Sequence, residues 1–359
     1  MFYKTGTAFF FLIFLVFLSP STVIAENNNS LDEDKIRIAV LYWSMNIPGQ
    51  VAMAKGLEQR AKELNQLAIA NKLPQIELIK RVAGDGDDGV ERQISQMKEV
   101  VSMKPDVIIV QPTDNAALAQ PLRLANQHNI PVVAYDQYIS GGKLASFVTS
   151  NNHQAGYLNG EYIASLFPGS KELRLILVEY PLVSSTVERL NGFLDALKDY
   201  KQSYTILNSY QAVEPSSGTI AGKQIVADFP EKGSVDVVFT VNDGGGLNVV
   251  NELVKAGRHE IIVATTDGDP ESINNIKRGR LTHIDTAQFC GPLGEQAINL
   301  AYDIMMNRTI PSLILIPVYP ITKDTLSNYP GWKGPIPVTF KKPWFSQKKY
   351  WDNQLKLTK

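Results

Sequence analysis

The chain has 359 residues, of which 35 are basic and 36 acidic, with a formal net charge of −1 at pH 7. A chain this close to neutral lacks the basic surface that attracts nucleic acid or anionic membranes, so we expect neither as a partner. Its length favours two domains over one core, and its single cysteine, Cys290, excludes an intrachain disulfide.

The first 25 residues have the pattern of a secretory signal peptide. Lys4 precedes an apolar run at positions 8–18, and Val23-Ile24-Ala25 provides a small-residue cleavage site. The apolar run is shorter than the ~20 residues that cross a bilayer core. We therefore expect cleavage after Ala25, export to the periplasm and no membrane insertion of the mature chain.

Beyond the leader, continuous apolar segments alternate with amphipathic ones. We expect strands at 36–42, 76–82, 107–110, 132–135, 173–178, 204–207, 235–239, 261–264, 281–284 and 313–317. We expect helices at 51–67, 90–103, 116–128, 155–166, 188–200, 218–228, 247–256, 271–278 and 294–306. Strands that are apolar throughout are typical of parallel sheets with helices on both faces. The predicted fold class is therefore α/β, with two doubly wound parallel-sheet lobes.

The residues that follow these strands form the candidate ligand site, because open parallel sheets bind ligands beyond the carboxyl ends of their strands. The strand ends carry the side chains Trp43, Asn46, Thr113, Asp114, Asp136, Gln137, Glu179, Tyr180, Asn242, Asp243, Asp267 and Gln288. The candidate ligand-binding residues are Trp43, Asn46, Gln50, Asp136, Gln137, Asn242, Asp267 and Gln288. Together they offer a flat apolar face and paired donors and acceptors, which suits a small polar ligand such as a sugar. The alternative roles are helix capping for the Asn and Asp residues, and a core position for Trp43.

An ordered set of short motifs resembles the ribose-binding type of periplasmic sugar-binding protein, from residue 36 to about residue 317. The motifs are Pro112-Thr113-Asp114, Ala125-Asn126, Asn129-Ile130-Pro131, Tyr135-Asp136, Asn242-Asp243, Thr266-Asp267-Gly268 and Ala287-Gln288. The resemblance implies two lobes joined by three crossing strands, with the hinge at Ser150, Asn151, Phe289 and Pro317. It also implies that Asp136, Asn242, Asp267 and Gln288 bind sugar hydroxyls, and that the membrane partner is the permease of an ABC transporter.

Two departures from the family's pattern concern its arginines. Gln137 stands where the family has an arginine after the fourth-strand aspartate, and Val187 aligns with the arginine of the second lobe. We therefore expect the site to lack a guanidinium fork for vicinal hydroxyls, and no particular sugar is predicted.

The resemblance also sets the expected domain boundaries. Residues 1–25 are the signal peptide and residues 26–35 a flexible leader. The N-terminal lobe comprises 36–150 plus 289–316, and the C-terminal lobe 151–288 plus 317–330. Residues 331–359 form a proline-rich and aromatic C-terminal extension, which either packs back over a lobe or offers a surface to a partner.

Other chemistry finds little support in the sequence. The loop at 84–89 matches a dinucleotide fingerprint, but its three aspartates would repel a pyrophosphate, and Asp88 with Glu91 is expected to cap the next helix instead. The four histidines have no metal-ligand spacing, so we expect no metal site. We also expect no cofactor and no catalytic residue. Two alternatives remain: a glycosidase using Asp136 and Asp267, and a sensory protein that presents its closed form to a sensor kinase or chemoreceptor.

Overall fold

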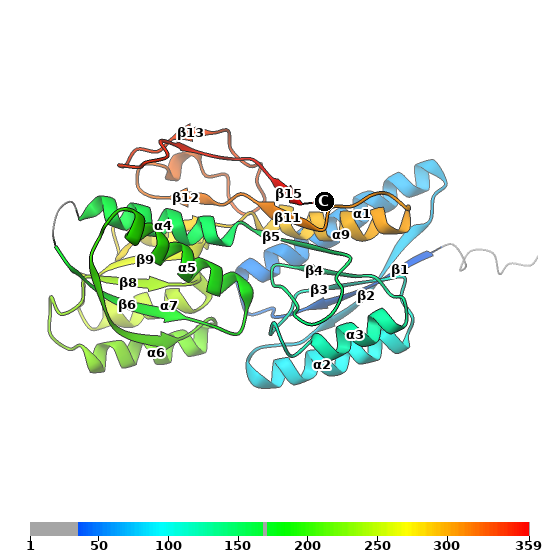
Figure 1. Cartoon of the computed structure of the whole chain (residues 1–359), viewed down its shortest axis with the longest axis horizontal. Coiled ribbons are helices and arrows are strands. Elements are labelled where there is room, and N and C mark those ends of the chain that lie inside the picture. Colours follow the sequence, from blue (N-terminus) through cyan, green and yellow to red (C-terminus); the bar gives the residue numbers. More distant parts are fainter. Residues whose placement is uncertain (1–34, 168–170, 359) are drawn as a thin grey trace, which may run out of the picture. The chain divides into compact units, whose positions relative to one another are not determined.

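The computed structural model describes residues 35–167 and 171–358 of the chain. The expected signal peptide lies outside these residues. From Lys35 onward the chain forms one compact unit that contains two large β-sheets, each with helices on both faces (Figure 1). The predicted α/β fold with two doubly wound lobes is confirmed.

The N-terminal lobe has a seven-stranded sheet in the order β15-β11-β5-β4-β3-β1-β2. Its strands are β1 (Lys35–Tyr42), β2 (Gln75–Val82), β3 (Val107–Val110), β4 (Val132–Tyr135), β5 (Ser146–Ser150), β11 (Leu313–Ile316) and β15 (Lys356–Thr358). Its helices are α1 (Pro48–Asn71), α2 (Gly86–Ser102), α3 (Ala119–Gln127) and α9 (Cys290–Met305). All strands but β15 are parallel to their neighbours.

The C-terminal lobe has a six-stranded sheet in the order β12-β10-β9-β8-β6-β7. Its strands are β6 (Leu173–Glu179), β7 (Tyr204–Gln211), β8 (Val237–Thr240), β9 (Ile262–Asp267), β10 (Thr282–Ala287) and β12 (Tyr319–Ile321). Its helices are α4 (Asn152–Leu166), α5 (Ser184–Asp199), α6 (Pro215–Asp228), α7 (Asp243–Lys255) and α8 (Pro270–Arg278). Here β12 is antiparallel to β10 at the edge, and the other pairings are parallel.

The apolar strands are explained by burial on both sides of each sheet. In β1, Ile38 and Val40 belong to the core shared with α1 and α9, whereas Ala39 and Leu41 belong to the core shared with α2 and α3. All four residues are fully buried. A strand covered on both faces has no position at which a polar side chain can reach water, so it reads as a continuous apolar run.

The chain passes between the two sheets three times. The first passage links β5 to α4, the second links β10 to α9, and the third links β11 to β12. They lie side by side: the Ser150 hydroxyl donates to the Gln288 amide oxygen at 2.8 Å, and the Asn151 amide donates to the Ile316 carbonyl at 2.8 Å. Asn151 and Phe289 are the N-cap residues of α4 and α9, and Pro317 lies between β11 and β12.

The C-terminal extension folds back over the described chain. Glu161 of α4 is buried and accepts hydrogen bonds from Lys342 Nζ at 2.6 Å and Trp344 Nε1 at 2.9 Å. β13 (Phe340–Lys341) and β14 (Tyr350–Trp351) pair as a short antiparallel sheet. The Trp351 indole of β14 is buried and donates to the Val318 carbonyl at 2.6 Å. The extension then ends as β15, an edge strand of the N-terminal sheet.

Most helices start about one turn earlier than the sequence predicts. Helices α5, α6 and α7 begin at 184, 215 and 243, where the apolar pattern predicts 188, 218 and 247. Helix α2 begins at Gly86 with Asp85 as its N-cap, so the expected cap at Asp88 is wrong. The early turns are rich in Ser, Pro, Gly and Asp and therefore carry no apolar periodicity.

Candidate ligand-binding cleft

A narrow cavity lies where the carboxyl ends of the two sheets face each other. Its lining side chains come from both lobes: Trp43, Gln50, Met53, Asp136 and Gln137 on one wall, and Val183, Ser185, Thr186, Arg189, Val213, Asn242, Asp267 and Gln288 on the other. Its volume is about 20 Å³. That is room for about one water, against roughly 300 Å³ or more for a typical ligand pocket, so the cleft as it stands is too small for a ligand of several heavy atoms.

Asp136 lines the cavity on the N-terminal wall. It follows β4 with a left-handed backbone (φ 64°), and its amide donates to the Val148 carbonyl at 2.8 Å. Gln111 Nε2 donates to its Oδ2 at 2.9 Å, while Oδ1 is buried without a hydrogen-bond partner among the described residues. Burial raises the pKa of Asp136, against the opposing effects of the Gln111 hydrogen bond and of the Arg189 charge. The carboxyl therefore has one oxygen available to a donor on a ligand.

Asp267 and Arg189 form a buried ion pair on the C-terminal wall. Arg189 Nη1 donates to Asp267 Oδ1 at 3.0 Å and to the Val241 carbonyl at 2.9 Å, and its Nε donates to Asn152 Oδ1 at 2.9 Å. Gln288 Nε2 also donates to Asp267 Oδ1, at 2.7 Å. This wall therefore holds its carboxylate with a fixed cation and an amide.

Two glycines allow Arg189 to reach this position. A Cβ atom on Gly156 of α4 would collide with the Arg189 carbonyl oxygen, and one on Gly192 of α5 would collide with the His153 carbonyl oxygen. The bare backbones let α4 and α5 pack closely, which brings the Arg189 guanidinium to the start of α4. Arg189 corrects the sequence analysis, which aligned Val187 with the second-lobe arginine and expected no guanidinium in the site.

Trp43 and Gln137 connect the two walls directly. The Trp43 side chain is 3% exposed and packs with Val183 and Val213 of the opposite lobe. Gln137 Nε2 donates to the Ser185 hydroxyl at 2.8 Å, and the Ser185 amide donates back to Gln137 Oε1 at 3.1 Å. Opening the cleft has to break both contacts.

Gln50 and Asn242 line the cavity and also support the backbone. Gln50 Oε1 accepts from the Ser44 amide at 2.9 Å. Asn242 is the N-cap of α7: its Oδ1 accepts from the Gly245 amide at 3.2 Å, and its Nδ2 donates to the Val213 carbonyl at 2.9 Å. The capping alternative therefore holds for Asn242, which fixes the loop that forms this part of the wall.

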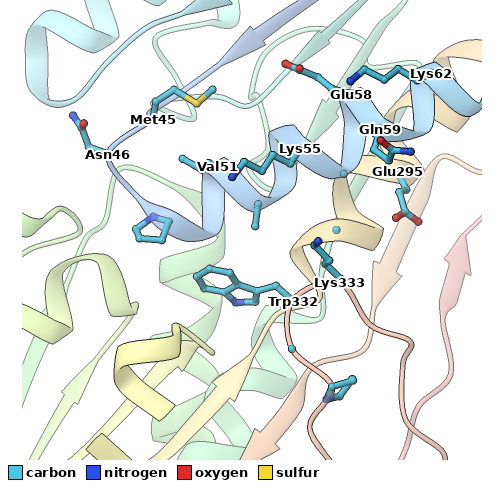
Figure 2. Close-up of a pocket in the computed structure, with 16 residues that line it drawn as sticks. Met45, Asn46, Val51, Lys55, Glu58, Gln59, Lys62, Glu295, Trp332 and Lys333 are labelled. Carbon is cyan, nitrogen blue, oxygen red and sulfur yellow. The ribbon is translucent and has the colours of Figure 1, made fainter. Parts of the chain in front are cut away.

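Asn46 does not belong to the cavity, contrary to the sequence analysis. Its Nδ2 donates to Asp85 Oδ2 at 2.7 Å in an exposed position. Asn46 instead borders a separate groove of about 1060 Å³ between α1 and the segment at 330–333. Figure 2 shows Lys55, Glu58 and Lys62 of α1 on one side of this groove and Trp332 on the other.

Trp332 links the groove to the cleft. Trp332 lines the groove, and its Nε1 donates to the Asp267 carbonyl at 2.6 Å. The groove is much the larger space, but its charged residues belong to one lobe and the extension. Of these two spaces, the cleft is the one that draws polar side chains from both lobes, so we take the cleft as the ligand site.

Behind Asp267 lie two further buried carboxyls, Asp243 and Asp285. Burial raises the pKa of Asp243 well above its usual value and the pKa of Asp285 to about 7. Asp243 accepts from the Thr265 hydroxyl and the Asp269 amide, each at 2.8 Å. The charge of each carboxyl disfavours ionisation of the other, which adds to the effect of burial, so we expect the pair to share at least one proton at neutral pH.

Sequence reasoning missed Gln111, Ser185, Thr186 and Arg189. Gln111 follows β3 directly and could have been found by the same strand-end rule as the others. Ser185, Thr186 and Arg189 lie in the first turns of α5, which the sequence analysis started too late. In residues 35–167 and 171–358, no group of three or more His, Cys, Asp or Glu side chains is arranged to hold a metal ion. Within the same residues, no helix combines the length and apolarity needed to span a bilayer.

Two α/β lobes around an interlobe cleft define a class of bilobal ligand-binding proteins. The profile of the family described as "Periplasmic binding protein domain" matches residues 38–309. The chain therefore belongs to the periplasmic binding protein family, and the resemblance found in the sequence is confirmed.

Relatives and solved structures agree with this assignment. The ribose import binding protein of Bacillus subtilis is 25% identical over 295 residues, which cover 82% of this chain and 90% of the relative. That of Escherichia coli is 24% identical over 278 residues, covering 77% and 87%. A solute-binding protein from Actinobacillus succinogenes with bound D-allose has a TM-score of 0.69 at 24% identity, over 82% of this chain and 100% of that one. The Caulobacter myo-inositol binding protein has a TM-score of 0.70 at 20% identity, over 83% and 96%. The structures share the fold.

Proposed function

We propose that this protein is a periplasmic solute-binding protein that closes around a sugar or polyol and delivers it to the permease of an ABC transporter. The observation that carries the proposal is the cleft, where a carboxyl and an indole on one lobe face a guanidinium–carboxylate pair and amides on the other. The relatives from Bacillus subtilis and Escherichia coli are named for ribose import, and two similar structures hold D-allose and myo-inositol. Export with removal of residues 1–25 is part of the same proposal.

Lobe closure is the proposed mechanism. The three passages near Ser150–Asn151, Gln288–Phe289 and Pro317 act as the hinge, and the lobes turn about them as rigid bodies. A ligand that contacts both walls stabilises the closed state by its greater affinity for that state. The permease then recognises the closed form. Because Arg189 already neutralises Asp267, we propose binding without catalysis.

A thermal-shift screen tests this function. Pentoses, hexoses and inositols are added to the purified mature protein, and a true ligand at 100 times its Kd raises the free energy of unfolding by ~2.7 kcal/mol. We expect at least one member of the panel to give this response, and isothermal titration to give its Kd.

Two variants identify which space binds the ligand. Trp43→Ala removes an indole from the cleft and should weaken binding at least about fivefold, because a buried aromatic contact contributes ~1 kcal/mol or more. Asn46→Ala alters the groove and should leave the Kd unchanged. If Asn46→Ala weakens binding and Trp43→Ala does not, the groove is the ligand site and the proposal fails.

A further inference from the structure

The charges that line the cleft do not balance. Asp136 and Asp267 face it from opposite lobes, and Arg189 is the one cationic side chain among the described residues of the lining. The Arg189 ion pair is with Asp267, at 3.0 Å, and its other hydrogen bonds go to Asn152 and the Val241 carbonyl. Asp136 therefore has no cation of its own.

Asp136 is also incompletely hydrogen bonded. Its residue is 4% exposed, and Oδ1 is buried without a hydrogen-bond partner in the described part of the chain. Gln111 donates to Oδ2, and the Gln137 side chain also favours the ionised form of Asp136, but both are neutral amides. A buried carboxylate left in this way is costly, and a charged donor on a ligand is the group that offsets the cost best.

The surroundings of the cleft add further negative charge. Near Tyr180, which packs with Trp43 and is half-buried, lie Asp87, Asp114 and Glu214. A site that has Asp136 in its lining and further acidic side chains near it attracts cations and repels anions.

Trp43 supplies the other element that a cation prefers. Its indole lines the same cavity as Asp136. A ring face and a carboxylate together bind an ammonium group by complementary electrostatics.

We propose that the ligand carries a protonated nitrogen, as in an amino sugar or an amino polyol, and that this nitrogen pairs with Asp136 Oδ1. The proposal rests on the proposed function of the cleft as a sugar or polyol site. The hydroxyls of the same ligand contact the opposite wall at Arg189 and Asp267. A neutral sugar leaves the charge of Asp136 uncompensated.

The test compares matched ligands by isothermal titration at about pH 6.5, below the usual pKa of such an amine. The probes are glucose, glucosamine and N-acetylglucosamine, the corresponding galactose series, and inositol with an amino-inositol. We expect the amine of at least one series to bind about tenfold or more tightly than its neutral and acetylated counterparts, the scale of one hydrogen bond to a charged group.

Two variants assign the preference to Asp136. In Asp136→Asn the side chain keeps its shape and loses its charge, so the ratio of the amine's affinity to that of its neutral counterpart should fall to within about threefold. Asp352 is exposed and distant in sequence from the cleft residues, and its Oδ1 accepts from the Gln354 amide, which an asparagine can replace. Asp352→Asn changes the net charge equally and should keep the full preference.

The outcomes separate this inference from the proposed function. Equal or tighter binding of the neutral sugars overturns the inference and leaves the sugar-binding function intact. An amine preference that survives Asp136→Asn also overturns the assignment. Tetramethylammonium is titrated as well, as a cation without hydroxyls. Its binding with no response to any sugar or polyol overturns the proposed function, and silence from every probe overturns both.

Discussion

The two walls of the cleft use the same residue type in different ways. Asp136 and Asp267 both stand at the end of a strand with a positive φ, 64° and 131°. On the C-terminal wall, Asp267 is held by Arg189 and Gln288, whereas on the N-terminal wall Asp136 accepts from the Gln111 amide and has the neutral Gln137 amide beside it. Matching positions in two similar lobes therefore differ in how much of the carboxylate the protein itself satisfies.

The largest expected effect on stability comes from breaking the Arg189–Asp267 ion pair of the C-terminal wall. Arg189→Met should lower the free energy of unfolding by about 3–5 kcal/mol at pH 7, because it leaves Asp267 as an unpaired buried carboxylate. Urea denaturation followed by tryptophan fluorescence measures the loss. Asp267→Asn should also destabilise, by leaving the guanidinium unpaired.

The double variant tests the cause of that loss. Combining Arg189→Met with Asp267→Asn removes both charges, so it should recover most of the stability that the single Arg189→Met loses. If the double variant is as unstable as the sum of the two single variants, the loss comes from packing between α4 and α5 and the ion pair is unimportant.

The buried carboxyls Asp243 and Asp285, behind Asp267, should affect how the free energy of unfolding depends on pH. Asp285 has a pKa raised to about 7 by burial, whereas an unfolded Asp titrates near ~3.9. The folded pair keeps a proton that the unfolded chain has released, so the pair's contribution to stability is full below about pH 4 and is lost as the pH rises to about 7. Asp285→Asn should remove up to about 1.4 kcal/mol per pH unit from the slope of stability in this window.

The matched measurement is urea denaturation of both proteins at several pH values between about 4 and 7. An asparagine can still accept from the Gly268 amide, which donates to Asp285 Oδ1 at 2.9 Å, and can donate to Asp243. A slope that is the same in the variant and the parent protein contradicts the shared proton.

The sequence predicted the fold better than the site. Solidly apolar strands and regular alternation with helices were enough to predict the two lobes, because burial on both faces of a sheet leaves a clear pattern. The same rule fails where a helix begins at the cleft. The first turns of α5 and α7 face polar surroundings, so their Ser, Gly and Asp residues show no apolar period, and the helix starts were placed too late.

Arg189 was missed for this reason, and also because its place depends on residues far away in the chain. The guanidinium reaches Asp267 because Gly156 and Gly192 let α4 and α5 come close. No local pattern around residue 189 contains that information. Asn46 shows the opposite error: it follows a strand, as the site residues do, but its side chain pairs with Asp85 outside the cleft.

The smallest expected effect on stability comes from Asp136 on the N-terminal wall, whose hydrogen bonding is incomplete among the described residues. Asp136→Asn should leave the free energy of unfolding of the ligand-free protein unchanged or raise it by up to about 1 kcal/mol at pH 7. Burial raises the pKa of Asp136, which means that the ionised carboxylate is less favourable in the folded protein than in the unfolded chain. Asparagine tolerates the left-handed backbone at this position and can accept the hydrogen bond from Gln111 with its own Oδ1.

The measurement is again urea denaturation at pH 7 without ligand, beside Asp267→Asn as the contrasting change on the other wall. One variant removes a charge that no cation pairs with, and the other removes a charge that holds Arg189 in place. Opposite signs of the two effects, small and favourable against large and unfavourable, are the expected result. A loss of more than about 1 kcal/mol in Asp136→Asn, comparable to the loss in Asp267→Asn, would show that the Asp136 carboxylate is a structural partner like its counterpart, and the distinction between the two walls would then have no energetic basis.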